Sequence, residues 1–554
     1  LLFIVFAVRL GLGLHRNAPR FFPDEFATFG MARQMSGAGS WEMFALDTYQ
    51  PGFAILIAPL NWFTSDSFVI LHAALVLQSA LAVASVVVLA QLVRRFTTMS
   101  RSGSMLTSVV ISLAPASVGA SAAAWAEPLV TLTFLLTLRG LLVFCDTGRA
   151  RVGAAAIAWS IVGITAHHRL LPLPAVAVVI VVWRLWSVGR RPAAAALSAM
   201  TVALVFASVR FSSLMVSSVW DDPGDRHTVT GVLARFENPL LVLDSVVGQT
   251  WYQLAATLGM AGVGAAAVAL ACFGGSVGGS VDLRPLDARV LAATLLPLVG
   301  LSALFMSGRD RIDHAVYGRY NDAVLWPLLA LGVAWAVGQA RAGFGSFERR
   351  DTWLIGGTSG LLLATALYLH LRGAVPDDGD LVPDMVSGVI WMSPSEQLVD
   401  VIPITLVALG LMSFALVTVR NQIKHLPLLV SVLGLVFGIG VAQAHALTDG
   451  DGFTRFSAMQ DLAGDPLEAG ETVGFRFTPV NAMVPWRAQQ EAAQLVQWYL
   501  PEIELVREPG THDDLRFVFA PFNDGDLRAA GASVVWVDER TLIALFRTPS
   551  PVDG

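Results

Sequence analysis

The sequence predicts a mainly α-helical membrane protein, in which a bundle of about thirteen transmembrane helices precedes a small α/β domain. Of the 554 residues, 55% are hydrophobic and only 14% are charged, whereas a soluble domain carries about 25% charged residues. The mean hydropathy is +0.63. The apolar residues gather in runs of roughly 15 to 25, the length with which a helix crosses a hydrocarbon core about 30 Å thick. A water-soluble globular protein of this size is therefore excluded.

The candidate spans follow one another along most of the chain, since each apolar run combines helical length with few charges. They lie near residues 1–14, 68–93, 105–123, 128–145, 152–166, 170–186, 193–211, 250–273, 289–307, 323–340, 352–371, 400–419 and 426–446. The loops between them differ too much in length for the inverted repeats of secondary transporters. We therefore predict one transmembrane domain over residues 1–447, without an internal repeat.

The loops between the candidate spans alternate in charge. One set is short and basic; it contains Arg94, Arg95, Arg101, Arg149, Arg151, Arg184, Arg190, Arg191, Arg284, Arg289, Arg341, Arg349, Arg350, Arg420 and Lys424. The opposite set is longer and acidic; it contains Asp24, Glu25, Glu42, Asp47, Glu127, Asp221, Asp222, Asp225, Asp377, Asp378, Asp380 and Asp384. The positive-inside rule places the basic loops in the cytoplasm and the acidic loops outside. This predicts a multi-pass plasma-membrane protein with a cytoplasmic amino terminus.

The composition changes after about residue 447, where charged and apolar residues become mixed. Strand-like runs occur at 473–477, 515–519 and 533–537, and residues 486–500 have helical spacing. We predict a small α/β domain over residues 448–554. Because an odd number of spans precedes this domain and the amino terminus is inside, the domain is expected to be extracytoplasmic.

The remaining composition limits the function classes. The formal net charge is −6 and no strongly basic surface is apparent, so nucleic acid is not an expected partner. Cys145 and Cys272 lie in apolar stretches without a CxxC spacing, which supports neither a disulfide framework nor a thiolate metal site. Lys424 is the only lysine among 36 basic residues, as the codon bias of a GC-rich, bacterial genome would produce.

The first external loop, residues 15–67, carries the clearest candidates for catalysis. Pro23 can start a helix, and Asp24 and Glu25 in the first turn suit the helix dipole. A carboxylate that lies beside lipid is partly removed from water, which strengthens it as a general base. Asp47, in the same loop, is a further candidate for the pocket. The alternative is that Asp24 and Glu25 only cap a helix.

The order of residues in this loop resembles a known family. An Asp-Glu pair after the first span precedes Tyr-x-Pro-Gly-Phe-x-x-Leu-x-x-Pro-Leu at residues 49–60. This arrangement is similar to the integral-membrane glycosyltransferases of the GT-C fold, which include protein mannosyltransferases, lipid A aminoarabinose transferase and bacterial cell-envelope arabinofuranosyl- and mannosyltransferases. The resemblance extends to the many spans and the external carboxy-terminal domain. It implies that a carboxylate of the first external loop is catalytic and that the donor is a sugar on a polyprenyl phosphate.

Two further segments lie on the same outer side. Glu127 ends the third candidate span, where similar enzymes often carry an acidic residue, and a simple cap of the span is the alternative. His167, His168 and Arg169 lie between the fifth and sixth spans, and ionisable groups at the membrane are functional candidates. One histidine could share a divalent cation with a carboxylate of the first loop, or it could pack as a hydrogen-bonded neutral group. The sequence leaves the need for a cation open.

Residues 307–322 place a basic segment on the acidic side of the membrane. Arginines there indicate an anionic ligand, because a guanidinium binds phosphate through two parallel hydrogen bonds. Arg319-Tyr320 resembles the arginine–tyrosine segment that contacts the phosphate of the lipid carrier in many GT-C enzymes. The resemblance implies that Arg319 and Tyr320 bind the donor phosphate, with Tyr317 and Arg169 as further candidates. The alternative is local pairing of Arg309, Arg311 and Arg319 with Asp310, Asp313 and Asp322.

With the resemblance, these residues predict an inverting glycosyltransferase. It would move a sugar, arabinofuranose or mannose, from a polyprenyl phosphate to a hydroxyl of a cell-envelope glycan or glycolipid at the outer face of the membrane. Asp24 would remove the acceptor proton, with Glu25 orienting or replacing it, and Arg319 would neutralise the departing phosphate. In the carboxy-terminal domain, the aromatic residues that could stack on a glycan acceptor are Trp486, Trp498 and Tyr499. For each of them a role in the domain core is the favoured interpretation.

Two rival functions also fit a polytopic membrane protein: a lipid-linked sugar transporter or flippase, and a non-catalytic subunit of envelope assembly. Transporters place ionisable groups in mid-span and carry broken spans in both halves, whereas here the ionisable clusters lie in outer loops. The assembly subunit would share the fold and differ only in activity. A test for transfer from a polyprenyl-phosphate sugar separates it from the enzyme.

Overall fold

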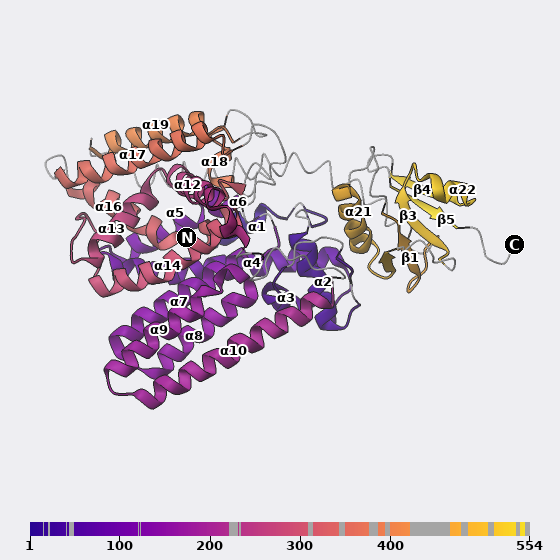
Figure 1. The fold of residues 1–554 in the computed structure, drawn as a ribbon, viewed down its shortest axis with the longest axis horizontal. Helices are drawn as coiled ribbons and strands as arrows, with labels where there is room; N and C mark the ends of the chain where they lie inside the picture. The colour runs from indigo at the N-terminus through magenta and orange to yellow at the C-terminus, as the bar shows by residue number, and fades with distance from the viewer. Residues whose placement is uncertain are drawn as a thin grey trace.

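In the computed structural model, α-helices make up the long amino-terminal part of the chain, and a five-stranded sheet lies near the carboxyl end (Figure 1). This confirms the predicted fold class. The structure describes residues 1–14, 16–19, 23–39, 41–43, 49–119, 121, 123–220, 231, 234–307, 314–342, 349–375, 386–393, 399–420, 462, 466–477, 486–507, 515–538 and 543–548.

The helices of the amino-terminal part follow the apolar runs of the sequence. They are α1 (Leu2–Gly11), α2 (Asp24–Ser36), α3 (Gly52–Ile57), α4 (Ser67–Phe96), α5 (Arg101–Ser112), α6 (Pro115–Gly119), α7 (Glu127–Thr147), α8 (Ala150–Ala166), α9 (Pro172–Ser187), α10 (Arg191–Ser217), α12 (Pro239–Ala256), α13 (Met260–Cys272), α14 (Pro285–Phe305), α15 (Arg319–Asp322), α16 (Trp326–Ala342), α17 (Arg349–Arg372), α18 (Ser387–Ile390) and α19 (Val401–Arg420). Short 3₁₀ helices are η1 (Ala58–Trp62), η3 (His168–Leu170) and η5 (Arg235–Glu237). Asp66 illustrates how the sequence starts a helix, since its carboxylate caps the first amide groups of α4.

Within the described residues, six helices are long and apolar enough to cross a membrane, so the predicted number of spans is not confirmed. They are α4, α7, the helix of residues His168–Ser187, α10, α14 and α17. The expected span 105–123 is divided into α5 and α6, because a proline disfavours helical geometry at the residue before it and Pro115 follows the end of α5. The expected span 426–446 lies outside the described residues.

The expected span 250–273 is not one straight helix. Helices α12 and α13 meet at an angle of 111°, and the turn between them has positive φ at Leu258 (48°) and Gly259 (76°). Glycine adopts this backbone region readily, whereas leucine does so at a cost. Polar side chains of α12 contact the segment of α15 at the candidate site described below.

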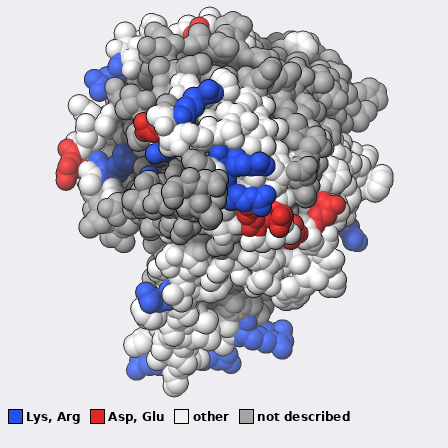
Figure 2. Space-filling view, turned by 90° about the vertical axis from the view of Figure 1, so that its right-hand side faces the viewer, with Lys and Arg blue, Asp and Glu red and all other residues white. Residues whose placement is uncertain are grey.

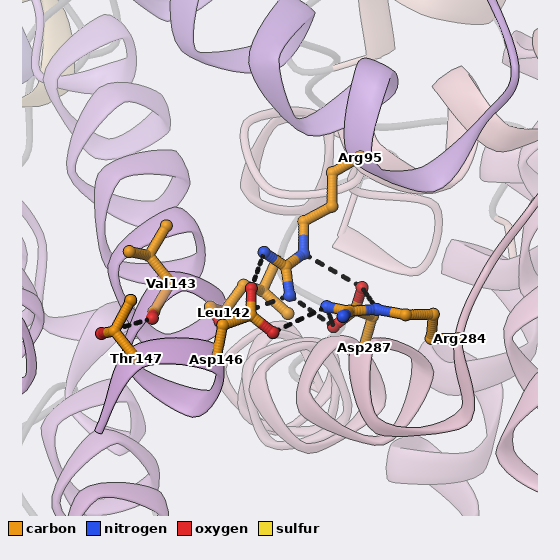
Figure 3. A network of polar contacts seen from close by, with 7 residues as sticks. All are labelled: Arg95, Leu142, Val143, Asp146, Thr147, Arg284 and Asp287. Atoms are coloured by element: carbon orange, nitrogen blue, oxygen red, sulfur yellow. Dashed lines mark hydrogen bonds and ion pairs between the residues drawn. The ribbon is translucent and has the colours of Figure 1, made fainter. Parts of the chain in front are cut away.

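A network of charges around the buried Asp287 connects three helices at the end of the bundle away from that site (Figure 3). Arg95 of α4 donates from Nη1 to Oδ2 of Asp146 (2.6 Å) and from Nη2 to Oδ1 of Asp287 (2.8 Å). Arg284 donates to the same two carboxylates, at 3.0 Å to Asp146 and 2.9 Å to Asp287. The side chain of Asp287 is fully buried, and its two arginine partners satisfy it. The network is structural, and it contains two arginines of the predicted basic loops.

Further arginines of the basic loops gather at the tip of α8, α9 and α10. The exposed ones are Arg149, Arg151, Arg190 and Arg191. Figure 2 shows basic and no acidic side chains at the lower tip of the molecule, and residues 147–220 contain no Asp or Glu. A one-sided cluster of this kind agrees with the positive-inside rule. The cytoplasmic placement of this tip stays a prediction.

The carboxy-terminal part forms a mixed sheet with two helices. Its strands β1 (Thr472–Phe475), β2 (Glu504–Arg507), β3 (Phe517–Pro521), β4 (Ser533–Asp538) and β5 (Ile543–Arg547) lie in the order β2-β1-β3-β5-β4. The strand β1 is parallel to β2 and β3, and β5 is antiparallel to β3 and β4. Helices α21 (Trp486–Tyr499) and α22 (Gly525–Ala529) complete this part. The expected strands and the expected helix over 486–500 are present, and Phe475, Phe517 and Phe519 form the buried centre.

Candidate functional site

Four buried charged side chains from separate segments meet on one side of the helical part. Asp24 begins α2, Glu127 begins α7, Arg319 begins α15, and Arg169 lies in η3. Their exposed fractions are only 8%, 4%, 8% and 2%, respectively. The two carboxylates stand at helix amino termini, where the helix dipole favours negative charge. All four residues were candidates from the sequence, and the structure brings them together.

Arg319 bridges the two carboxylates. Its Nη1 lies 2.6 Å from Oδ1 of Asp24, and its Nε donates to Oε1 of Glu127 at 2.6 Å. The guanidinium also lies over the ring of Trp125, 3.8 Å from the centroid. Burial acts to lower the pKa of Arg319, but the two carboxylates outweigh it and hold the pKa well above its ordinary value. Arg319 is therefore a permanent cation that keeps Asp24 and Glu127 side by side.

Arg169 has a different environment, because its guanidinium is buried without a hydrogen bond. None of its three nitrogens has a hydrogen-bond partner among the described residues, and neither has Oε2 of Glu127. Its Nη1 lies 3.5 Å from Oε1 of Glu127, and its Cζ lies 4.8 Å from the ring centre of Tyr320. A buried donor without a partner costs free energy, and a planar fork of donors suits a phosphate group. Arg169 is thus poised to bind an anion.

Aromatic rings form one wall of the site. Tyr320 contacts Tyr317 and His167, with ring centres 4.8 Å and 4.9 Å apart. Burial raises the pKa of Tyr320 to about 12, so its hydroxyl stays protonated at neutral pH and can donate a hydrogen bond. The ring of His168 packs edge-on against Phe305 at 5.2 Å. Of the two tyrosines proposed for phosphate binding, Tyr320 therefore lies next to Arg169, and Tyr317 packs against Tyr320.

The two histidines contribute packing to this wall. Their rings lie 4.7 Å apart, and Nδ1 of His167 accepts a hydrogen bond from the backbone N–H of Arg169 at 3.2 Å. Among the residues that the structure describes, no group of three or more His, Cys, Asp or Glu side chains is arranged to hold a metal ion. Asp47, the remaining pocket candidate, lies outside the described residues. The role of His167 that the structure shows is to fix the backbone that carries Arg169.

Glu25 is separated from this group although it follows Asp24 in the chain. Its carboxylate is fully buried and accepts from Nη1 (3.1 Å) and Nη2 (2.8 Å) of Arg16. The backbone N–H of Ala124 also donates to it, at 2.6 Å. These bonds connect α2 to the segment just before Glu127. Such an arrangement is typical of a residue that aligns two elements, and here it aligns the elements that carry the two site carboxylates.

A polar stripe on α12, which the sequence analysis did not single out, holds the segment of Arg319. Gln249 accepts from Nδ2 of Asn321 at 2.8 Å. Tyr252 and Gln253 donate to the carboxylate of Asp322 at 2.9 Å and 2.8 Å. Asp322 is thus occupied by α12 and does not pair with Arg319. Polar residues three and four positions apart on an apolar helix could have indicated this contact surface.

The pKa of the Asp322 carboxyl is unusually high. Burial raises its pKa from 3.8 to about 7, although the hydrogen bonds from Gln253 and Tyr252 act to lower it. Of the other residues considered for local pairing, Arg309, Asp310, Arg311 and Asp313 lie outside the described residues. The arginine of this segment that the structure describes, Arg319, binds the distant carboxylates of Asp24 and Glu127.

Comparisons with known proteins support the fold. No family model matches the chain, and no curated protein matches it in sequence. The crystal structure of ArnT from Cupriavidus metallidurans bound to undecaprenyl phosphate aligns with a TM-score of 0.53 at 14% identity, covering 100% of this chain and 97% of ArnT. The chain has the ArnT-like GT-C fold. The apo form of ArnT aligns with a TM-score of 0.52.

A more distant likeness is to the archaeal oligosaccharyltransferase AglB from Archaeoglobus fulgidus, in complex with an inhibitory peptide and a dolichol-phosphate. It has a TM-score of 0.41 at 9% identity and covers 94% of this chain and 69% of AglB. The predicted GT-C fold is confirmed by the match to ArnT, and with it the prediction of a multi-pass membrane protein.

Proposed function

We propose that the protein is a membrane glycosyltransferase that takes a sugar from a polyprenyl phosphate. The observation that carries this proposal is the buried, unsatisfied guanidinium of Arg169 beside the ion-paired cluster of Asp24, Arg319 and Glu127. A site with a guanidinium that lacks hydrogen-bond partners in the described structure and a nearby carboxylate can bind a phosphate ester and remove a proton from an acceptor. ArnT, which has the same fold, was crystallised with undecaprenyl phosphate.

In this proposal the phosphate is bound first by Arg169. The donors of Arg319 that point to Asp24 and Glu127 are already engaged. The three nitrogens of Arg169 lack hydrogen-bond partners within the described structure, and its ion pair with Glu127 is longer, at 3.5 Å. The Tyr320 ring supports one face of the Arg169 guanidinium, which leaves the edge of the fork for the phosphate oxygens. The positive charge stabilises the phosphate as it departs with both bonding electrons.

Asp24 is the proposed general base. Its pairing with Arg319 through Oδ1 fixes its position, and its other oxygen, Oδ2, takes the proton of the acceptor hydroxyl. The acceptor oxygen then forms a bond to the anomeric carbon while the bond from that carbon to the phosphate oxygen breaks. The products are the glycosylated acceptor and the polyprenyl phosphate, with inversion at the anomeric carbon.

The finer details of the substrates are part of the proposal. The resemblance of the first external loop to cell-envelope enzymes favours arabinofuranose or mannose as the sugar. The same resemblance favours a hydroxyl of an envelope glycan or glycolipid as the acceptor, at the outer face of the membrane.

The test is transfer from synthetic polyprenyl-phosphate arabinofuranose and polyprenyl-phosphate mannose by the full chain in lipid nanodiscs. We expect product with one of these donors, retained activity in the control Arg191→Ala, and loss of activity in Asp24→Asn. Arg191 is exposed at the tip of α10, which makes it a suitable matched surface change. Full activity in Asp24→Asn would falsify the assignment of the base. A wild-type protein that neither binds undecaprenyl phosphate nor uses either donor contradicts the proposed function.

A further inference from the structure

Helix α21 of the carboxy-terminal part lies against the first external loop, which carries Asp24. Gln494, Gln497 and Trp498 are the side chains that make the contact, and they are spaced so that they share one face of the helix. All three are buried, with exposed fractions of 0%, 2% and 2%. Buried glutamines are uncommon unless their amides are bonded, so the partners of this face are informative.

The amide of Gln497 pairs with both polar groups of one peptide unit. The backbone N–H of Glu42 donates to Oε1 of Gln497 at 2.9 Å, and Nε2 of Gln497 donates to the carbonyl oxygen of Glu42 at 3.0 Å. Gln494 donates to the same carbonyl at 2.7 Å. The two side chains thus bind Glu42 as a neighbouring β-strand would. They fix the chain that leaves the end of α2.

Trp498 contacts the segments on both sides of α2 and the helix itself. Its Nε1 donates to the carbonyl oxygen of Asn17, before α2, at 3.1 Å. Its ring lies 5.0 Å from that of Phe29, within α2, and 5.8 Å from that of Trp41, after α2. The Trp498 ring is therefore packed against the first loop. This agrees with the packing role that the sequence analysis gave beside glycan stacking.

A second bond joins the same two parts further along. Nη2 of Arg33, in the last turn of α2, donates to the carbonyl oxygen of Pro501 at 3.1 Å, just after α21. On its other side, the loop is held by the helical part, since the N–H of Met43 donates to the carbonyl of Val219 at 2.8 Å. The last turn of α2 is therefore bonded to the segment after α21 through Arg33. The segment that follows α2 is bonded to the segment after α10 through Met43.

The helix α2 needs such support because it is short. It contains 13 residues, and an isolated helix below about 12–15 residues is marginal in water. Its orientation depends on packing, and its first residue is Asp24, which must meet Arg319. A change in the tilt of α2 moves the Asp24 carboxylate relative to Arg169 and Arg319, which stand on other elements.

We propose that the polar face of α21 is a positioning element, which holds α2 in the orientation that keeps Asp24 in the site. Gln497 and Trp498 are its positioning residues. The catalytic consequence rests on the proposed function of Asp24. The inference that α21 keeps α2 in place does not depend on the proposed function of Asp24. The carboxy-terminal part thereby acts on the reaction without contacting the donor.

The test compares Gln497→Leu and Trp498→Phe with Arg528→Ala in the full chain. Gln497→Leu keeps the volume and removes the amide, and Trp498→Phe keeps a ring and removes the N–H donor. Arg528 is an exposed residue of α22 whose guanidinium contacts Phe522. Its variant therefore controls for damage to the same part of the protein.

Hydrogen–deuterium exchange of the α2 amides is the readout that does not require activity. We expect exchange over residues 24–36 to become about tenfold faster in both variants, because α2 opens locally when one of its supports is weakened. Amides of α4 and α7 should be unchanged, and so should all amides in Arg528→Ala except those of α22. Unchanged exchange in α2 overturns the proposal.

Transfer kinetics test the catalytic part. A displacement of about 1 Å at a reacting group costs roughly 100-fold in rate, so we expect kcat to fall by about tenfold or more. The Kd for undecaprenyl phosphate should stay within about twofold of wild type, because Arg169 and Arg319 do not stand on α2. Faster exchange with an unchanged kcat shows that α21 does not position the base. If the wild type transfers no sugar, the proposed function fails, and the exchange result alone decides whether α21 holds α2.

Discussion

The guanidinium of Arg319 lies 2.6 Å from the carboxylate of Asp24. The residue that the sequence assigned to the donor phosphate is thus the ion-pair partner of the residue assigned to the base. Because the same guanidinium also binds Glu127, it neutralises two buried carboxylates that would otherwise repel each other. The geometry therefore divides the proposed roles. Arg319 organises the two carboxylates, and Arg169 is the cation that we propose binds the donor phosphate.

Replacing Arg319 with glutamine is expected to destabilise the protein as well as abolish transfer. The change leaves the carboxylates of Asp24 and Glu127 buried without their cation, and breaking a buried ion pair costs about 3–5 kcal/mol. Arg319→Lys keeps the charge but not the two-sided geometry, so its loss should be smaller. Thermal unfolding in detergent measures both, with Arg191→Ala as control. A melting temperature of Arg319→Gln equal to that of wild type contradicts the bridging role.

Replacing Arg169 with glutamine should weaken ligand binding more than it lowers stability. Its nitrogens make no hydrogen bond in the described structure, and its ion pair with Glu127 is long, at 3.5 Å. We therefore expect a smaller loss of stability than in Arg319→Gln, which removes two contacts of 2.6 Å. A hydrogen bond to a charged group contributes about 1.5–3 kcal/mol, so binding of undecaprenyl phosphate should weaken by roughly 10- to 100-fold. Equilibrium binding of fluorescently labelled undecaprenyl phosphate to the protein in nanodiscs measures this loss of affinity. Wild-type affinity in Arg169→Gln assigns the phosphate to another cation.

These two variants show where sequence reasoning succeeds and where it stops. The parity of the spans placed Asp24, Glu127, Arg169 and Arg319 on one side of the membrane, and that was enough to predict that they share a region. Parity does not fix which side chain meets which. The pairing of Arg319 with Asp24, almost three hundred positions earlier in the chain, depends on how α2, α7 and α15 pack, which hydropathy does not encode.

The same limit explains the bend between α12 and α13. The sequence 250–273 has the apolar composition of one span, because hydropathy sums residues and ignores direction. The turn at Leu258 and Gly259 ends α12, where the N–H of Gly259 donates to the carbonyl oxygen of Leu254 at 2.7 Å. A glycine at positive φ is a local signal for the end of a helix, and a sum of hydropathy values does not register it. The long helices α4 and α7 were predictable because their composition alone requires burial in lipid or protein.

The acidity of Asp322 predicts how stability changes with pH. Its pKa is about 7 in the folded protein against an ordinary value of 3.8, so between these values the folded state holds a proton that the unfolded state has released. Stability from this group therefore falls as the pH rises from about 4 to 7 and levels off above 7. Asp322→Asn should lack this component. Unfolding of the two proteins between pH 5 and 8 compares them, and parallel pH profiles contradict the shifted acidity.

Neutral substitutions of Asp24 and of its chain neighbour Glu25 should have different effects. Asp24→Asn leaves Arg319 paired with Glu127 and removes the proposed base, so kcat is expected to fall by about 10²- to 10⁴-fold with a modest change in melting temperature.

Glu25→Gln instead leaves Arg16 buried beside a neutral amide, which should cost about 3–5 kcal/mol of stability. The kcat of the Glu25→Gln protein that remains folded should stay within about tenfold of wild type, since Glu25 acts only through the alignment of α2. Transfer kinetics and thermal unfolding of both variants, measured side by side, separate the two roles. A larger loss of kcat in Glu25→Gln than in Asp24→Asn would reassign the base to Glu25.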